Sequence, residues 1–381
     1  MRVLVDATAI PENRGGVGRY VDAIVPALLG EGIDVVCVTR AGAGRGFLEA
    51  GAEVHAAPRR VRSRPARFLW EQVGLPSLAR RVRADILLSP HYTMPLRAGL
   101  PVVATLHDAT FFTNPEWHVP AKARFFRLAT RVAVRRAAAL VVPSVATRDE
   151  VLDAVGGDPA DFFVAHHGVD STFQPAAPAE VDRVATSLGV EGRRTVVFLG
   201  TLEPRKNVVA LIDGWVEGFH GRDDAPTLVL VGARGWDEAI DGALARVPAD
   251  LHVVRAGYVP LEDLPAVLSG ATVVAYPSLG EGFGLPVLEA MACGAPVLTT
   301  KRLSLPEVGG DAVAYTETSA SEIARSLVAL VDDAPRRAAL GTAGRQRALQ
   351  FTWSAAAQRH AEAFDHALRR RGPDRVTRRA G

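Results

Sequence analysis

The chain has 381 residues, of which 48% are hydrophobic and 23% charged. This length exceeds one ordinary core, so we expect two domains of about 150 to 200 residues each. No apolar run approaches the roughly 20 residues of a membrane-spanning helix, and the first residues do not resemble a signal peptide. The two cysteines, Cys37 and Cys293, lie in no metal-ligand or disulfide pattern, which favours a reducing cytoplasm.

The net charge of +2 conceals an asymmetry along the chain. Residues 55–140 contain 15 Lys and Arg against 4 Asp and Glu, whereas residues 181–350 contain 16 against 21. The first half therefore carries a basic face. Nucleic acid is a poor partner for it, because no recognition motif with interleaved aromatic residues accompanies the charge.

Short β-branched runs alternate with helix-like stretches in both halves of the chain. Such alternation predicts parallel sheets covered by helices on both faces. The runs of the first half are residues 2–10, 34–39, 85–90, 101–108 and 139–144, and those of the second are 195–201, 226–232, 251–259, 272–278 and 295–300.

A segment rich in Pro and Ala, residues 170–178, separates the two halves and reads as a linker. We therefore expect an α/β protein with two Rossmann-like, doubly wound domains facing a cleft. The first would cover residues 1–172 and the second residues 173–350. Residues 351–381 would form a final helix that returns to the first domain, followed by a loose tail.

The segment with the most chemical information runs from Glu281 to Glu289, with the sequence EGFGLPVLE, and follows a buried-type strand. Pro286 suits the first turn of a helix and Gly294 its end, which predicts a helix over residues 285–293. The preceding residues Gly282, Phe283 and Gly284 would present backbone N–H groups at its N-terminus, where the dipole favours phosphate. Two carboxylates beside such a loop suit a nucleotide sugar. Two solvated glutamates at an ordinary helix start are the alternative.

A pair of cations, Arg205 and Lys206, follows another strand and precedes a helix that begins near Asn207. A helix N-terminus disfavours positive charge, so the pair has no structural benefit there. A diphosphate would convert the repulsion into charge-assisted hydrogen bonds. Solvated surface charge near Glu203 is the other interpretation.

Two weaker signals lie in the first half. The loop from Glu12 to Tyr20 contains Gly15 and Gly16 but lacks the third glycine of a dinucleotide fingerprint. A loop that a diphosphate or sugar approaches closely fits it better, and a simple glycine turn stays open. His107, with Asp108, ends a strand at the edge where ligands bind, although a core histidine is equally consistent. The pair His166 and His167 indicates a turn rather than a metal site.

Taken together, these motifs resemble glycosyltransferase family 4, the group 1 glycosyl transferases. The resemblance covers nearly the whole chain and rests on GGVGRY, LHD, PSVATRDEV, HHGVD, FLGTLEPRKNV, EGFGLPVLEAMACGAPV and SLPEVGGDA, which occur in this order. It implies the GT-B fold, two Rossmann domains, and transfer with retention of anomeric configuration. The variants GTLEPRKN and GGVGRY are similar to mannosyltransferase-like members that build polysaccharides, which favours GDP-mannose as donor.

The resemblance also implies roles for single residues. Glu281 would touch the donor sugar and Glu289 the ribose, while residues 282–285, including Leu285, would offer N–H groups to sugar and phosphate. Lys206 would bind the diphosphate, Gly16 would approach it, and His107 would lie beside the reacting sugar. One position departs from the pattern: Thr201 stands where many members have Arg, so Arg205 would supply that charge.

The expected reaction needs no cofactor and no metal ion, because no DxD motif stands at a strand end; Asp223–Asp224 and Asp332–Asp333 are adjacent pairs in loop-like contexts. We expect a hexose, favouring mannose, to pass to a glycan or lipid-linked acceptor. Alternatives are a UDP-hexose donor, a related epimerase or phosphorylase, and a non-catalytic sugar-nucleotide-binding subunit. An NAD dehydrogenase is excluded because the chain lacks the glycine fingerprint of a dinucleotide-binding site. A phosphorylase would need a lysine to bind pyridoxal phosphate, and the chain has only three lysines.

The basic face suggests where in the cell the protein acts. Residues 122–136 are helix-like and place apolar side chains among six cations, as in a helix lying on anionic lipid. A core-facing helix with a solvated basic side is the alternative. The expected location is the cytoplasm, with possible contact at the inner face of the membrane.

Overall fold

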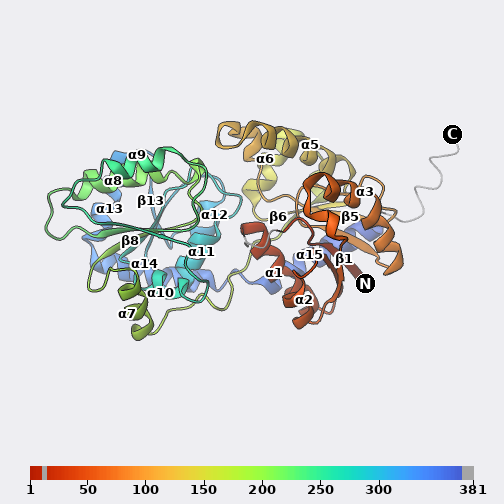
Figure 1. The fold of residues 1–381 in the computed structure, drawn as a ribbon, viewed down its shortest axis with the longest axis horizontal. Coiled ribbons are helices and arrows are strands. Elements are labelled where there is room, and N and C mark those ends of the chain that lie inside the picture. The colour runs from red at the N-terminus through yellow and green to blue at the C-terminus, as the bar shows by residue number, and fades with distance from the viewer. Residues whose placement is uncertain (11–14, 371–381) are drawn as a thin grey trace. The chain divides into compact units, whose positions relative to one another are not determined.

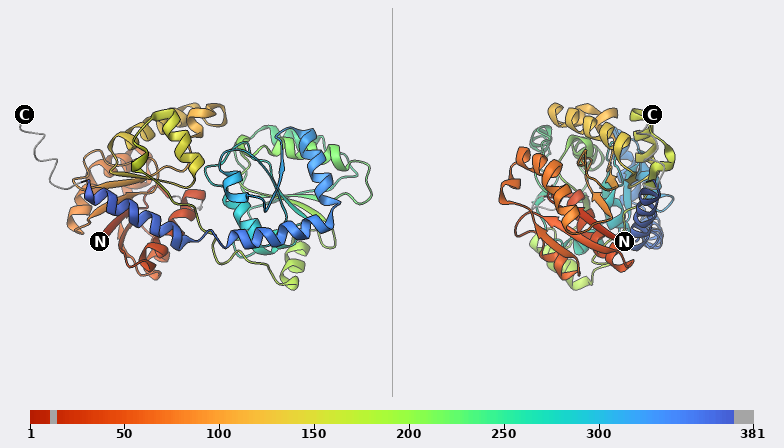
Figure 2. Two further views of the ribbon diagram at one scale, coloured as in Figure 1. Left: turned by 180° about the vertical axis from the view of Figure 1, so that it is seen from behind. Right: turned by 90° about the vertical axis from the view of Figure 1, so that its right-hand side faces the viewer.

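The computed structural model describes residues 1–10 and 15–370, which form two compact units. Unit 1 comprises residues 1–168 together with the chain from Thr352 onward, and unit 2 comprises Val169–Phe351. The tail expected after residue 371 and part of the Glu12–Tyr20 loop lie outside the described residues. Figures 1 and 2 show a parallel sheet with helices on its faces in each unit.

Unit 1 has a seven-stranded parallel sheet in the order β3-β2-β1-β4-β5-β6-β7. Its strands are β1 (Arg2–Asp6), β2 (Asp34–Thr39), β3 (Glu53–Ala56), β4 (Ile86–Ser89), β5 (Val102–Thr105), β6 (Ala139–Val142) and β7 (Phe162–Val164). Its helices are α1 (Gly16–Gly30), α2 (Arg45–Glu49), α3 (Arg64–Arg81), α4 (Thr110–Thr113), α5 (Pro120–Arg136), α6 (Val145–Val155) and α15 (Trp353–Arg369), with 3-10 turns η1 (Arg59–Arg62), η2 (Pro115–Trp117) and η3 (Pro159–Asp161).

The side chains of successive residues in β1 point to opposite faces of this sheet. Val3 and Val5 belong to a buried cluster with α1 and α15, whereas Leu4 belongs to a second cluster with α3 and α5. Both faces are therefore covered, which explains why the strand is continuously apolar rather than alternating.

Unit 2 has a six-stranded parallel sheet in the order β10-β9-β8-β11-β12-β13. Its strands are β8 (Thr195–Leu199), β9 (Thr227–Val231), β10 (Val253–Gly257), β11 (Val273–Tyr276), β12 (Val297–Thr300) and β13 (Ala314–Thr316). Its helices are α7 (Pro178–Ser187), α8 (Val208–Phe219), α9 (Ala239–Ala245), α10 (Leu264–Ser269), α11 (Leu285–Ala292), α12 (Leu305–Gly309), α13 (Ala320–Val331) and α14 (Ala334–Ala348), and η4 (Pro204–Lys206) is a 3-10 turn.

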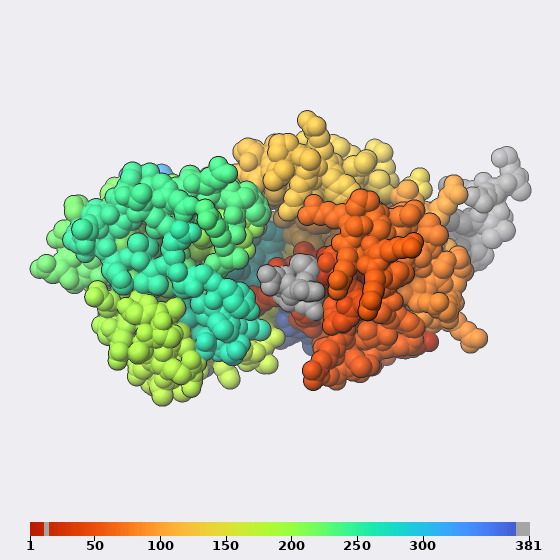
Figure 3. All heavy atoms as spheres, viewed as in Figure 1, coloured from red at the N-terminus to blue at the C-terminus, as the bar shows by residue number. Residues whose placement is uncertain are grey.

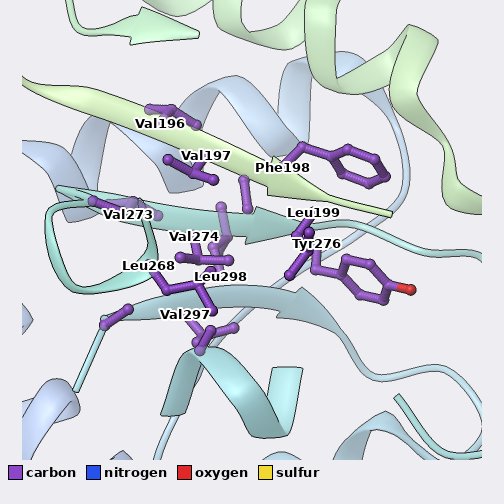
Figure 4. Packing of buried hydrophobic residues seen from close by; sticks show 14 of the residues in the cluster. Val196, Val197, Phe198, Leu199, Leu268, Val273, Val274, Tyr276, Val297 and Leu298 are labelled. Carbon is purple, nitrogen blue, oxygen red and sulfur yellow. The ribbon is translucent and has the colours of Figure 1, made fainter. Parts of the chain in front are cut away.

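The centre of unit 2 is filled by buried β-branched side chains on both faces of the sheet. Val196, Val197, Val273, Val274 and Val297 lie on neighbouring strands of this cluster (Figure 4). Towards the carboxyl ends of the strands, Phe198 and Tyr276 stack with ring centroids 5.8 Å apart, and the Tyr276 hydroxyl marks where the core becomes polar. The expected α/β fold with two doubly wound sheets is confirmed.

The last helix, α15, belongs to unit 1 and lies along its sheet (Figure 2). The Nε2 atom of His360 in this helix lies 2.6 Å from the hydroxyl of Tyr20 in α1. The Nδ1 atom of His360 lies 2.7 Å from the carbonyl oxygen of Ala356. The His167 ring packs against the rings of both Tyr20 and Trp353, at centroid distances of 5.1 and 5.4 Å. Buried histidines thus tie the two ends of unit 1 together.

This arrangement predicts that unit 1 loses stability in mild acid. Burial lowers the pKa of His360 from 6.5 to about 4, so the unfolded chain binds more protons than the folded one between these pH values. The stabilising contribution is complete above about pH 6.5 and is lost as pH falls towards 4. Melting curves from pH 7 to 4 should show the decline. His360→Gln, which keeps a partner for Tyr20, should make it less steep, while His91, His107 and His167, whose pKa values burial also lowers, maintain the rest. An unchanged slope in that variant would contradict the assignment.

Candidate active site

The segment from Glu281 to Glu289 joins the end of β11 to α11. The helix begins at Leu285 and is followed by Cys293 and Gly294, the latter with a φ of 77°, close to the sequence-based expectation. Gly284 caps the helix with a φ of 102°, and a Cβ there would come within 2.9 Å of Leu305. Only glycine fits this position without strain.

Hydrogen bonds from Thr300 and Ser304 hold the loop before α11 in place. The Ser304 hydroxyl lies 2.7 Å from the carbonyl oxygen of Glu281 and 2.9 Å from that of Phe283. Thr300 likewise donates to the carbonyl of Ser278 at 2.6 Å. Gly282 and Phe283 are therefore held in place beside the helix N-terminus, where the dipole favours an anion.

Glu281 is the centre of a buried ionic cluster and is only 7% exposed. Its Oε1 atom accepts from Lys206 at 2.6 Å, from the Ser278 hydroxyl at 2.8 Å and from the Tyr276 hydroxyl at 2.9 Å. Its Oε2 atom pairs with Arg205. Burial raises the pKa of Glu281, but the charges of Arg205 and Lys206 outweigh burial and bring it down to about 2, so the carboxylate is ionised at every working pH.

Both cations of the sequence motif converge on this carboxylate. They lie on η4, directly before Asn207, which caps α8 in the left-handed conformation. Lys206 is 8% exposed, and burial together with the neighbouring Arg205 lowers its pKa. Arg205 also donates to the carbonyl of Gly280 at 2.7 Å.

The alternative of solvated surface charge is therefore wrong for Lys206, and so is that of two solvated glutamates, since Glu289 is 1% exposed. Glu281 and the two cations carry a formal charge of +1, and Glu203, which lies 3.5 Å from Arg205, brings the four groups to neutrality. Arg205 lies at the outer side of the cluster, and together with the helix N-terminus it is suited to hold an anionic group such as a diphosphate.

The site residues expected in unit 1 are less tightly arranged. Gly15 caps α1 and Gly16 begins it, so Gly16–Tyr20 is helical and not part of a loop, which corrects the expectation. Among the described residues, which leave out 11–14, a Cβ at either glycine would meet nothing within 4 Å, so their packing does not require glycine at these positions. Space for a ligand beside them is compatible with this finding.

His107 follows β5 and is partly buried. Its Nε2 atom lies 2.7 Å from the carbonyl oxygen of Pro90, which places the ring proton on Nε2 and leaves Nδ1 as an acceptor. Burial lowers the pKa of His107, so the ring is neutral near pH 7. Asp108 instead accepts from the hydroxyl of Tyr92 at 3.0 Å.

Several side chains that complete the candidate sites carry no distinctive signal in the sequence. Tyr276, Ser278 and Ser304 hold Glu281 and its loop, although each resembles an ordinary strand or turn residue in sequence. In unit 1, Asp6, Glu71 and His91 form the one group of three potential metal ligands within the described residues. His166 and His167 belong to no such group in the described part of the chain.

Two parallel, doubly wound units with an ionic cluster at a glycine-capped helix define a glycosyltransferase of the GT-B type. A family model described as "Glycosyl transferases group 1" matches residues 193–333, and one described as "Glycosyltransferase Family 4" matches residues 14–173. The chain belongs to this family of glycosyltransferases, as the sequence motifs predicted.

Known relatives cover several activities. The chain is 35% identical to the O-antigen chain mannosyltransferase B of Escherichia coli over 69% of its length and 70% of that protein. It is 32% identical to the alpha-maltose-1-phosphate synthase of Mycobacterium tuberculosis over 59% of its length, but spans only 62% of that enzyme. It is 30% identical to the D-inositol 3-phosphate glycosyltransferase of Corynebacterium aurimucosum over 67% of its length and 63% of that enzyme.

Solved structures share the fold over the whole chain. The complex of Anabaena HepE with UDP and glucose superposes with a TM-score of 0.76, covering 96% of this chain and 99% of that one at 22% identity. WaaG, a glycosyltransferase of lipopolysaccharide biosynthesis, gives a TM-score of 0.74 over 96% and 99% of the two chains at 15% identity. At these identities the likeness concerns the fold.

The ionic cluster predicts a large stability cost for Glu281→Gln. The change leaves two buried cations without their carboxylate, which should lower the free energy of unfolding of unit 2 by about 3 kcal/mol. Glu203→Gln is the matched control, because Glu203 lies 3.5 Å from Arg205 at the outer side of the cluster, and it should cost less than about 0.5 kcal/mol. Urea unfolding measures both, and equal effects would contradict the central place of Glu281.

Proposed function

We propose that the protein transfers mannose from GDP-mannose, with retention of configuration, to a glycan or lipid-linked acceptor in the synthesis of a cell-surface polysaccharide or glycolipid. The observation that carries the proposal is the cluster of Glu281, Arg205 and Lys206 at the N-terminus of α11. The likeness to an O-antigen mannosyltransferase supports mannose as the sugar. A UDP-hexose donor is the second candidate, supported by the UDP-glucose complexes of HepE.

In the proposed reaction the leaving group is the nucleoside diphosphate. Arg205 stabilises the negative charge that develops on the leaving diphosphate. It supplies the positive charge that many family members have at the position of Thr201. Lys206 adds positive charge while it holds Glu281, and Glu281 in turn accepts from a hydroxyl of the donor sugar. Residues 282–285 provide the helix N-terminus for the phosphates, and Glu289 binds the ribose diol.

The diphosphate itself would accept the proton of the attacking acceptor hydroxyl on the face that it leaves, so no protein nucleophile is needed. His107, a residue of unit 1, would contact the donor sugar. The free Nδ1 atom of its neutral imidazole would accept a hydrogen bond from the sugar. Gly15 and Gly16 would let the diphosphate approach the start of α1. We also propose that the reaction needs no divalent ion, because Arg205 and the N-terminus of α11 already stabilise the negative charge of the leaving group.

A donor screen tests the proposal. GDP-mannose, UDP-glucose, UDP-N-acetylglucosamine and UDP-galactose are compared by nucleotide release and by thermal shift, with and without EDTA. We expect GDP-mannose to be hydrolysed fastest and EDTA to have no effect. Binding of none of the four donors would overturn the proposal, and inhibition by EDTA that manganese reverses would overturn metal independence.

Variants in the same assay separate the roles of the two carboxylates. Glu281→Gln should lower turnover by about 100-fold while nucleotide affinity changes much less, because its interaction with the sugar strengthens in the transition state. Glu289→Ala should weaken both nucleotide binding and turnover. Unchanged turnover in both variants would point to a non-catalytic subunit.

We further propose that unit 1 contacts anionic membrane from the cytoplasmic side. Leu128 and Phe125 of α5 are 62% and 38% exposed, and Leu69 and Val73 of α3 are 69% and 63% exposed. The rings of Phe68 and Phe125 lie 5.0 Å apart, so the two helices form one surface (α5 is gold in Figure 3). Arg64 of α3 and Arg124 and Arg131 of α5 are exposed on the same two helices. Among the described residues, no helix has both the length and the apolar character needed to cross a membrane.

Vesicle sedimentation tests this surface. Leu128→Ser combined with Leu69→Ser should reduce binding to phosphatidylglycerol vesicles by about tenfold, because two exposed apolar side chains lose their burial in lipid. Leu349→Ser in unit 2 is the matched control, since Leu349 is 72% exposed, and should have no effect. Absence of binding by the unmodified protein, or equal binding by all variants, would contradict the proposal.

A further inference from the structure

A pocket lies at the amino edge of the unit 1 sheet, opposite the edge that carries His107. Its volume is about 960 Å³, and its lining comes from the loop before β5, the end of α5 and the end of α15. Val102 begins β5 and Ala138 directly precedes β6, so the pocket faces the amino ends of two neighbouring parallel strands. His107 follows the other end of β5, about 13 Å away along an extended strand. The amino-edge pocket is therefore separate from the candidate active site.

The pocket combines a small apolar wall with positive charge. Ala98, Val102 and Ala367 in its lining are buried. The sequence after residue 370, which lies outside the described range, contains four Arg and one Asp and so brings no negative charge overall. No Asp or Glu occurs among the described residues that line the pocket, and its charged residues are the exposed side chains of Arg97, Arg135, Arg136 and Arg370.

Most of these guanidinium groups have no partner in the described part of the chain. Arg370 forms an ion pair with Asp161 at 2.5 Å. The side chains of Arg97, Arg135 and Arg136 make no hydrogen bond or ion pair with a described residue. Three unpaired cations around one pocket repel each other, and an anion would replace that repulsion with charge-assisted hydrogen bonds.

The ends of two helices explain only part of this charge. Arg135 and Arg136 lie in the last turn of α5, and Arg370 caps the end of α15. Each helix C-terminus carries about half a negative charge and favours a cation. Two such ends and Asp161 balance about two of the four positive charges, which leaves the pocket with about +2. Arg97 belongs to neither helix, so a helix dipole does not account for its position.

The remaining charge and the shape of the pocket favour a phosphate group. Guanidinium groups match phosphate oxygens with pairs of parallel N–H bonds, and three terminal oxygens can serve more than one arginine. A phosphate monoester carries up to two negative charges, whereas a single carboxylate brings one charge and two oxygens. The buried alanines beside the arginines leave room for a glycerol-like group attached to the phosphate.

We propose that the amino-edge pocket binds the phosphate of an organic phosphate ester through Arg97, Arg135 and Arg136. The ester is either a soluble metabolite or the headgroup of an anionic lipid, which present the same chemistry. This site goes beyond the proposed glycosyl transfer, because the diphosphate of the donor is assigned to the Glu281 cluster of unit 2.

Isothermal titration calorimetry of the full chain tests the site, with excess GDP present to occupy the donor site. The probes are glycerol 3-phosphate and dihexanoylphosphatidylglycerol below its micelle concentration, with glycerol and dihexanoylglycerol as uncharged analogues. Arg135→Gln combined with Arg136→Gln should weaken binding by at least about tenfold, because two charged donors are lost. Arg80→Gln combined with Arg81→Gln is the matched control, an exposed pair in the last turn of α3 outside the pocket, and should change affinity less than about twofold.

Arg97→Gln is an independent variant, because Arg97 lies in a loop and stabilises no helix end; it should weaken binding by at least about threefold. Binding of glycerol 3-phosphate would assign the pocket to a soluble ester, and binding of the phospholipid alone would assign it to a lipid. The proposal is overturned if neither phosphate binds, if the uncharged analogues bind as tightly, or if the control pair weakens binding as much as the pocket residues do. Failure of GDP to bind would count against the proposed function and not against this site.

Discussion

The ionised carboxylate of Glu281, buried between two cations, is the constraint on which the rest of unit 2 depends. A single buried charge would be too costly, and two cations side by side on η4 would repel each other. Together the three groups fix the turn before α8 relative to the loop before α11. Tyr276 and Ser278 then complete the coordination of the carboxylate.

The cluster also shapes what the site can bind. Arg205 and the helix N-terminus beside the cluster are in position before any ligand arrives, so binding of an anion requires little reorganisation. Arg205 is the outer cation, in contact with the partly exposed Glu203, whereas Lys206 is enclosed with Tyr276. This division supports Arg205 as the group that meets the leaving diphosphate and Lys206 as the group that fixes Glu281.

The sequence predicts the elements of this site better than its contacts. Pro286 and Gly294 mark the limits of α11, and the position of Arg205 and Lys206 before a helix indicates an anion site, because these signals are local. Their pairing with Glu281 joins residues 75 or more positions apart, and it depends on β8 and β11 being neighbours in the sheet. The proximity of Asp6 and His91 could not be predicted from the sequence for the same reason, because β1 and β4 are adjacent only in the fold. The start of α1 at Gly16 was misjudged because glycines usually disfavour helices.

The central claim is retaining transfer from GDP-mannose at the Glu281 cluster. Proton NMR of the sugar released from GDP-mannose, in which the anomeric carbon is α, tests it most directly. We predict that α-mannose appears first and that the β-anomer grows only by mutarotation, with the Glu281→Gln variant releasing little of either. Initial release of β-mannose, or no release of mannose from any preparation that binds GDP, would contradict the account.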